Sequence, residues 1–284
     1  MTTHVLQVDE ALRQLSIACG RDRSVESRYA PYMCPKNRDA LRNYFEKLEA
    51  VMEDPAHREW GIHVSEISGE EGWECDRWIW YCLNGIPEET WKDDALIRTW
   101  WMGDGVHFCV FPRIVPALLF HYGNRIEILE VKVEVSIPAG PNFLRGTPDF
   151  VLRYRLDGRS PETVVIDVKS TSASMHEKRV KGRKHIDKAN RQREIENEVQ
   201  YERQVAIYTS LLEADYGLLL YWVKQYPHDF EQSVIRYRPA IIRSVDRRIE
   251  TVIDNNDVAP EPRSGPHCLK CKFYEQCWSE TRRK

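Results

Sequence analysis

The sequence lacks any stretch that could act as a secretory leader or a membrane anchor. Its first residues, MTTHVLQVDEALRQL, have neither the basic start nor the apolar run of a signal peptide. The apolar runs, such as GLLLYWV at 217–223, are far shorter than the roughly 20 residues that a spanning helix needs. We therefore expect a cytoplasmic protein, in which disulfide bonds are rare.

The chain also lacks internal repeats, low-complexity tracts and a strong net charge. It has 41 basic and 44 acidic residues, for a formal net charge of -3, which argues against general coating of nucleic acid and leaves only a local basic patch. What it does have is 42% hydrophobic and 30% charged residues over 284 positions. This composition predicts a folded protein with a sizeable core.

Helical and strand-like patterns follow one another along the chain. Residues 1–60 have helical periodicity, clearest over 37–54, and we predict that they form a helical N-terminal extension. We predict that residues 61–284 form one domain. Strands are predicted at 126–135, 150–156, 163–169 and 216–225. Helices are predicted at 73–83, at 93–111 with a break near Gly103 and Gly105, at 195–214 and at 244–255.

A strongly basic segment, residues 176–193, precedes the predicted helix at 195–214. It has little apolar content, and two interpretations are equally weighted: a solvated mobile insertion, or a basic loop that contacts phosphates. Its basic residues are Lys178, Arg179, Lys181, Arg183, Lys184, Lys188, Arg191 and Arg193.

Two carboxylates and a lysine lie on a predicted hairpin. Side chains alternate across a strand, so Asp167 and Lys169 project from the same face. If the strands pair antiparallel around the Asp157–Gly158 turn, Asp149 falls opposite Asp167. Two carboxylates so close require a compensating cation, and Mg²⁺ or Mn²⁺ would suit them. The plain alternative is a surface salt bridge on an edge strand, which contributes little to stability.

These residues form part of a larger pattern. Pro148-Asp149 followed by Asp167-Val168-Lys169 resembles the PD-(D/E)XK nuclease superfamily. Upstream, Gly103 and His107 resemble the Gly-x-x-x-His element of its RecB-type branch, and downstream Gln204 and Tyr208 resemble the Gln-x-x-x-Tyr element of the same branch. The resemblance implies an α/β fold in which helices flank a mixed central β-sheet.

The resemblance also implies roles for these residues. Asp149, Asp167, His107 and the carbonyl of Val168 would hold the divalent ion, and Lys169 would orient the attacking water and stabilise developing negative charge. Gln204 and Tyr208 would share one helix face and contact the substrate near the site. Each has a plainer alternative: His107 an ordinary histidine, and the Gln204–Tyr208 pair part of an amphipathic helix. Glu134, a further candidate ligand, is more simply an exposed acid.

Three of the eight cysteines cluster near the C-terminus. Cys268, Cys271 and Cys277 could hold zinc or an iron–sulfur centre, and a fourth ligand is needed. Candidates for it are Cys75, Cys82, Cys34 and His267. Spacing alone does not decide among them.

The cysteine pattern resembles the iron–sulfur subset of RecB-type nucleases, which includes AddB, the CRISPR-associated RecB-like exonucleases and phage relatives. That resemblance implies a 4Fe-4S cluster that stabilises a helical cap. It also implies that Cys75 is the fourth ligand, because Cys75 and Arg77 form a Cys-x-Arg motif. Cys82 is the second candidate. Loss of the cluster would destabilise the fold.

The function implied is a metal-dependent deoxyribonuclease of a prokaryotic or phage-infected cell. The resemblance favours an exonuclease that acts on single-stranded DNA ends with 5′ to 3′ polarity, and endonuclease action is also known among the relatives. The pathways it implies are DNA repair, recombination, phage replication or CRISPR adaptation. It could act as a homo-oligomer or within a recombination or CRISPR adaptation complex. The alternatives are a zinc-stapled nucleic-acid-binding protein without nuclease activity, and a site-specific restriction-type endonuclease.

Overall fold

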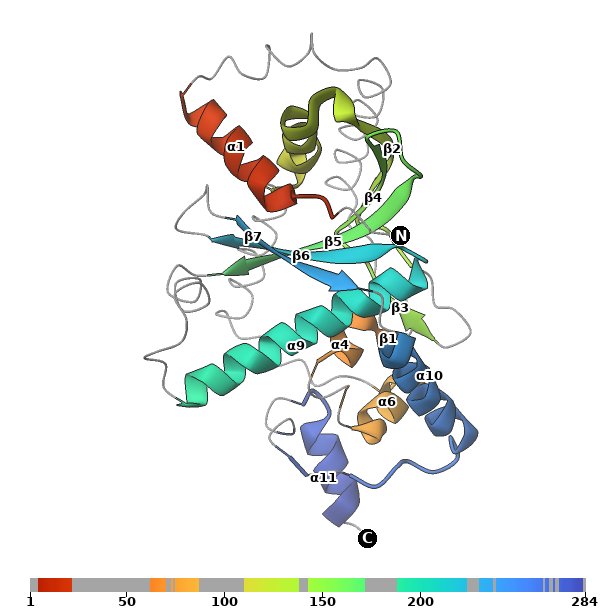
Figure 1. The fold of residues 1–284 in the computed structure, drawn as a ribbon. Helices are drawn as coiled ribbons and strands as arrows, with labels where there is room; N and C mark the ends of the chain where they lie inside the picture. Colours follow the sequence, from red (N-terminus) through yellow and green to blue (C-terminus); the bar gives the residue numbers. More distant parts are fainter. Residues whose placement is uncertain are drawn as a thin grey trace.

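A mixed five-stranded sheet lies at the centre of the molecule (Figure 1). The computed structural model describes residues 5–21, 62–69, 73, 75–86, 110–137, 143–171, 188–223, 230–236, 239–262, 264–265, 268 and 271–282. The strand order is β2-β4-β5-β6-β7, and β1 and β3 form a separate two-stranded sheet. The strands are β1 (Ile62–His63), β2 (Ile126–Val133), β3 (Leu144–Arg145), β4 (Phe150–Leu156), β5 (Glu162–Thr171), β6 (Tyr216–Val223) and β7 (Phe230–Arg236).

The central hairpin is formed by β4 and β5, which pair antiparallel. Asp157 and Gly158 make its turn with φ angles of 51° and 70°, the left-handed conformation that glycine and aspartate tolerate best and that tight hairpins require. The helix α9 (Lys188–Leu211) follows β5 in the chain and leads to β6, which pairs with β5 in parallel. A parallel pair needs such a long crossover connection.

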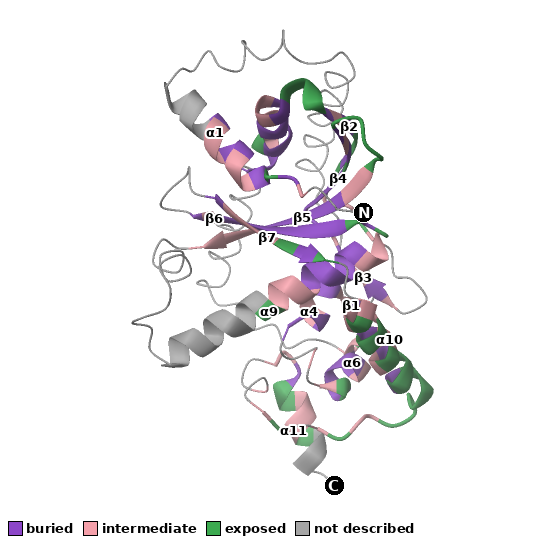
Figure 2. Ribbon diagram, viewed as in Figure 1, coloured by how far each residue is buried: buried purple, intermediate pink, exposed green. Residues whose placement is uncertain are grey.

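The two faces of the sheet are covered by different helices. Residues 110–122, which are helical, and α1 (Val8–Arg21) share a buried core with one face, to which β5 contributes Val164, Ile166 and Val168. Val165, one position over, belongs to the other core, on the side of α9. Figure 2 shows β5 and β6 buried between these layers. This strict alternation decides which side chains of β5 meet α9.

The N-terminal helix is fastened to the sheet by hydrogen bonds. The backbone NH groups of Val8 and Asp9 donate to Oε1 of Gln232 on β7, at 2.8 and 3.2 Å. The NH of Leu6 donates to the hydroxyl of Tyr216 at 3.1 Å. A distant side chain thus satisfies NH groups that a helix start leaves without partners. The segment predicted as an extension therefore contributes to the main core.

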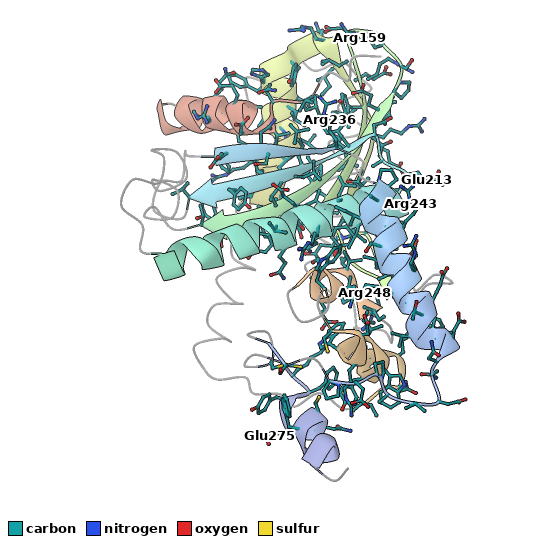
Figure 3. The ribbon with its side chains drawn as sticks, turned by 60° about the horizontal axis from the view of Figure 1, so that its bottom comes forward. Arg159, Glu213, Arg236, Arg243, Arg248 and Glu275 are labelled. Atoms are coloured by element: carbon teal, nitrogen blue, oxygen red, sulfur yellow. The ribbon has the colours of Figure 1, made fainter. Side chains whose placement is uncertain are left out.

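A helical layer lies beyond α9 (Figure 1). It contains α4 (Val64–Ile67), α6 (Asp76–Leu83), α10 (Pro239–Asp254) and α11 (Tyr274–Arg282), while a 3-10 helix, η2 (Gly123–Arg125), precedes β2. Arg248 of α10 reaches the start of α6, where it donates to Asp76 at 2.7 and 2.9 Å (Figure 3). We call α6, α10, α11 and the segments joining them the cap.

The structure confirms the predicted mixed sheet with flanking helices and each predicted strand. It corrects the start of α9, which begins at Lys188 instead of residue 195, so that the end of the basic segment 176–193 is helical. The strand β7 and the helix α11 were not predicted. The predicted helical segments 37–54 and 93–109 lie outside the described residues. No described helix has both the length and the apolar character required to cross a membrane.

Candidate active site and cysteine pocket

The β4–β5 hairpin brings the two predicted aspartates together. Phe150 pairs with Ile166, so Asp149, just before β4, falls opposite Asp167 in the antiparallel register. Both are buried, with exposed fractions of 8% and 1%. The alternation across β5 directs Asp167 and Lys169 to the face that α9 covers and Val168 to the opposite core, as predicted.

The two carboxylates are held in different ways. Oδ2 of Asp149 accepts a hydrogen bond from the backbone NH of Val168 at 2.6 Å, which locks this side chain against the neighbouring strand. Oδ2 of Asp167 lies 2.7 Å from Nζ of Lys169. Its Oδ1 is buried and, among the described residues, no hydrogen-bond donor reaches it. A buried carboxylate oxygen without a donor is costly unless a cation binds there.

Lys169 carries the positive charge of this site. Burial alone would lower its pKa, but the nearby carboxylates of Asp167 and Asp149 outweigh burial, and the pKa is raised above its ordinary value. The amine is therefore a cation that can donate hydrogen bonds, not a free base. Its Nζ also lies over the ring of Tyr201 at 5.1 Å from the centroid, within the range of a cation–π contact.

Gln204 and Tyr208 extend from α9 towards the same face of the sheet, and both are buried. Gln204 is 6% exposed and Tyr208 is completely buried. Burial, and next the carboxylate of Asp167, raise the pKa of Tyr208. A Cβ atom added at Gly146 would lie 2.5 Å from Cε1 of Tyr208. Both members of the pair are thus buried on this face of the sheet, and their contact with substrate near the site stays a prediction.

Tyr201 is a site residue that motif reasoning missed. It lies three positions before Gln204 and seven before Tyr208 on α9, so all three lie on one helix face. The spacing of these three residues can be seen in the sequence. The sequence does not show, however, that an aromatic residue on this amphipathic helix contacts Lys169. The contact of Tyr201 with Lys169 depends on the β4–β5 hairpin, which places Lys169 next to α9.

The acidic pair suits a divalent cation. Two buried carboxylates, one with an oxygen that no donor in the described part of the chain reaches, provide the hard oxygen ligands that Mg²⁺ and Mn²⁺ prefer. His107 lies outside the described residues. Glu134 is half-buried, and its backbone NH donates to the carbonyl of Asp149 at 2.9 Å, beside the site. Among the residues described, no three His, Cys, Asp or Glu side chains are grouped as a site for one metal ion.

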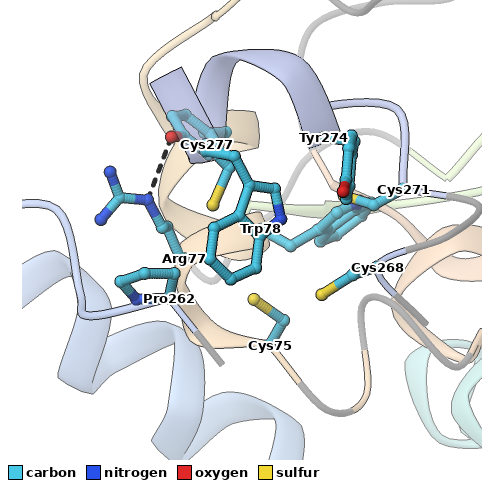
Figure 4. A pocket seen from close by; sticks show the side chains of 10 residues that line it. Cys75, Arg77, Trp78, Pro262, Cys268, Cys271, Tyr274 and Cys277 are labelled. Atoms are coloured by element: carbon cyan, nitrogen blue, oxygen red, sulfur yellow. Dashed lines mark hydrogen bonds between the residues drawn. The ribbon is translucent and has the colours of Figure 1, made fainter. Parts of the chain in front are cut away.

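A second group of candidate ligands lies in the cap, where four cysteines line one pocket. They are Cys75 at the start of α6, Cys268, Cys271, and Cys277 in α11. In Figure 4 their sulfur atoms surround the space beside Trp78. Cys82 packs against the same core but does not line this pocket. Cys34 and His267 lie outside the described residues.

The residues around the cysteine pocket make ionic and cation–π contacts with α4 and α6. Nζ of Lys272 donates to Glu66 of α4 at 2.9 Å and lies 5.1 Å from the centroid of the Trp78 ring. Burial raises the pKa of the Cys277 thiol, and the guanidinium of Arg77 opposes this. Four cysteine side chains that line one pocket are a suitable donor set for a multi-metal centre.

Comparison with solved structures gives distant similarities. SSO0001 is 19% identical, with a TM-score of 0.42, over 85% of this chain and 95% of that one. The alkaline exonuclease LHK-Exo from Laribacter hongkongensis is 10% identical, with a TM-score of 0.42, over 78% and 94%. A phage-related exonuclease from Haemophilus somnus 129PT is 16% identical, with a TM-score of 0.29, over 54% and 64%. A search of curated proteins found no match.

The family comparison covers most of the chain. The PD-(D/E)XK nuclease superfamily matches residues 67–278, a range that contains the acidic hairpin, the α9 residues and all four pocket cysteines. This nuclease assignment agrees with the buried aspartate pair and the adjoining lysine. The chain belongs to the PD-(D/E)XK nuclease superfamily.

Proposed function

We propose that this nuclease is a metal-dependent exonuclease that hydrolyses phosphodiester bonds at the ends of single-stranded DNA, with 5′ to 3′ polarity. The observation that carries the catalytic part is the juxtaposition of Asp149, Asp167 and the protonated Lys169 on one face of the β4–β5 hairpin. Substrate and polarity rest on the resemblance of the sequence motifs to RecB-type exonucleases.

Asp149 and Asp167 would hold Mg²⁺ or Mn²⁺, with His107 and the carbonyl of Val168 as proposed further ligands. Support comes from the burial of both carboxylates and from Oδ1 of Asp167, which no described donor reaches. When bound, the ion polarises the phosphodiester and lowers the pKa of a water molecule. The hydrogen bond from Val168 to Asp149 keeps one carboxylate in place for this purpose.

Lys169 would orient the attacking water and stabilise the negative charge that develops on the phosphate. Its raised pKa supports a role as a cation and hydrogen-bond donor. Gln204 and Tyr208, given their burial, would act by packing behind the acidic pair and fixing its position. Such preorganisation places the reacting groups before the substrate arrives.

The four pocket cysteines, Cys75, Cys268, Cys271 and Cys277, would bind a 4Fe-4S cluster. Their arrangement around one pocket supports this, together with the Cys-x-x-Cys spacing. The cluster's role would be structural, because the cap that contains it is built from segments far apart in the chain. Brown protein with iron and acid-labile sulfide is expected, and stoichiometric zinc in their place would refute the cluster.

The decisive test is digestion of end-labelled DNA, linear and circular, single- and double-stranded, with Mg²⁺, Mn²⁺ or EDTA. We expect shortening of linear single strands from the 5′ end with a divalent ion, no action on circular single strands, and loss of activity in Lys169→Ala. Cleavage of circles would refute the need for an end, and defined fragments of duplex DNA would indicate a restriction-type enzyme. DNA binding without any metal-dependent cleavage would refute the catalytic proposal.

A further inference from the structure

Trp73 contacts both α9 and the cap. The guanidinium carbon of Arg203, on α9, lies 4.1 Å from the centroid of the Trp73 ring, well within the range of a cation–π contact. The backbone carbonyl of Trp73 accepts a hydrogen bond from Nη1 of Arg248 in α10. Trp73 also packs against the core that contains residues of α6, α10 and α9. One half-buried residue thus connects α9 with the cap.

Arg248 extends this connection to the cysteine pocket. Its Nε and Nη2 donate to Oδ1 of Asp76 at 2.9 and 2.7 Å. Asp76 begins α6 and directly follows Cys75, which lines the pocket. Contacts therefore run without interruption from Arg203 on α9 to the wall of the pocket.

The short helix α4 makes a second connection. Nε2 of Gln200, on α9, donates to the carbonyl of Ser65 at 3.4 Å. The next residue of α4, Glu66, accepts a hydrogen bond from Nζ of Lys272 at 2.9 Å. Lys272 directly follows Cys271, which lines the pocket. Each of the two connections thus ends one residue from a pocket cysteine.

The residues of α9 that make these contacts lie beside those of the acidic site. Gln200 and Arg203 are three positions apart and share one face of the helix, and Tyr201 and Gln204, each one position later, share the neighbouring face. The ring of Tyr201 lies 5.1 Å from Nζ of Lys169. A helix moves as a rigid element, so a shift of α9 at the cap would also move Tyr201 and Gln204 relative to the β4–β5 hairpin.

We propose that Trp73 and Arg203 are positioning residues that fix the place of α9 over the acidic site, and that through their contact the cap strengthens the binding of a divalent cation by Asp149 and Asp167. This inference deepens the nuclease function proposed above and rests on it. A guanidinium stacked on an indole ring fixes both a distance and an orientation, whereas most exposed ion pairs contribute little.

Arg203→Gln tests the contact, because it removes the charge and keeps a polar side chain. The full-length protein is titrated with Mn²⁺, free Mn²⁺ is followed by EPR, and kcat and KM are measured on end-labelled linear single-stranded DNA. We expect Mn²⁺ to bind roughly 2- to 30-fold more weakly, with kcat reduced at sub-saturating Mn²⁺ and recovered at saturating Mn²⁺. Arg203→Lys, which retains a cation for the ring, should recover part of the affinity.

Substitutions of Trp73 show whether the two residues act as a pair. Trp73→Leu should weaken Mn²⁺ binding as much as Arg203→Gln does, and Trp73→Phe should remain closer to wild type because it keeps an aromatic ring. The double variant Trp73→Leu/Arg203→Gln should lose no more than either single variant. Arg243→Gln is the matched control, since Arg243 is an exposed arginine of α10 (Figure 3). It should leave the Mn²⁺ affinity unchanged.

Hydrogen exchange gives a readout that loss of stability alone would not produce. Coupling between two sites is reciprocal, so a cap that strengthens Mn²⁺ binding must itself be stabilised by Mn²⁺. We expect Mn²⁺ to slow the exchange of α6 amides in the wild type and in Arg243→Gln. It should have no such effect in Arg203→Gln or Trp73→Leu.

The outcomes separate this inference from the nuclease function on which it rests. Wild-type Mn²⁺ affinity in Arg203→Gln and Trp73→Leu, with Mn²⁺-dependent cleavage intact, would overturn the inference and keep the nuclease. Fully additive losses in the double variant, or an equal loss in Arg243→Gln, would also overturn it, because the contact would then have no specific effect. A wild-type protein that neither binds Mn²⁺ nor cleaves DNA would refute the nuclease function and the inference together.

Discussion

At the residue scale, Lys169 forms an ion pair with Asp167, so its charge should matter both for the proposed catalysis and for the stability of the fold. Removing it in Lys169→Gln should lower nucleotide release by about 100-fold or more, the usual cost of losing a donor aimed at developing charge. It should also destabilise the protein, because Asp167 is 1% exposed and its Oδ2 loses the Nζ at 2.7 Å.

Lys169→Gln/Asp167→Asn separates these two effects. Removing both partners of a buried pair costs less than removing one, so the double variant should recover stability in urea unfolding with EDTA present, yet stay inactive. Recovery of activity together with stability would show that Lys169 acts only through the fold.

The ring of Tyr201 offers a finer test at the same scale. Its centroid lies 5.1 Å from Nζ of Lys169, and a cation–π contact of about 0.5–2 kcal/mol corresponds to roughly 2- to 30-fold in rate if it is made in the transition state. Tyr201→Leu should lower kcat by that factor with little change in KM, whereas Tyr201→Phe, which keeps the ring, should remain near wild type. Equal losses in both variants would point to the hydroxyl instead.

At the element scale, the position of α9 over the sheet depends on a glycine in β6. A Cβ atom at Gly217 would lie 2.3 Å from Cγ1 of Val205 and 2.8 Å from Oγ1 of Thr209. Gly217→Ala should therefore push α9 away and lower the free energy of unfolding by about 1–3 kcal/mol, as overpacking does. Adding Val205→Ala should restore part of it in a double-mutant cycle, and simple additivity would contradict this contact.

The same elements show what sequence reasoning can reach. β4 and β5 were predictable because their apolar residues alternate around an Asp-Gly turn, and their register then places Asp149 opposite Asp167. β7 was missed because FEQSVIR mixes polar and apolar residues as an edge strand does. The start of α9 was missed because 188–194 is charged and lacks an apolar period.

The burial of Gln204 and Tyr208 could not be predicted from the sequence, for a different reason. Helical spacing places Gln204 and Tyr208 on one face of α9 but does not say how far the sheet encloses that face. Tyr208 lies close to Gly146, a residue of the segment after β3, and is completely buried. Such contacts between distant segments leave no periodic signal in the chain.

At the scale of the whole molecule, the two faces of the sheet belong to two different hydrophobic cores. The face covered by α1 has one core, whereas α6, α10, Cys271 and Cys277 pack in the core on the side of α9. The C-terminal segment is joined to this second core by Lys272, which pairs with Glu66 at 2.9 Å, and by Phe273, which is 1% exposed. The proposed cluster would add its bonds to this half alone.

Cysteine substitution should therefore loosen one half of the molecule and spare the other. In Cys277→Ser, hydrogen exchange is expected to accelerate in 75–86 and 271–282, while β4, β5 and β6 keep their protection, because local opening follows the contacts that are lost. Cys82→Ser is the matched control, since Cys82 packs in the same core without lining the pocket. Equal loosening in both variants would mean that packing, not ligation, holds the cap, and loss of protection throughout the sheet would mean that the two cores unfold as one.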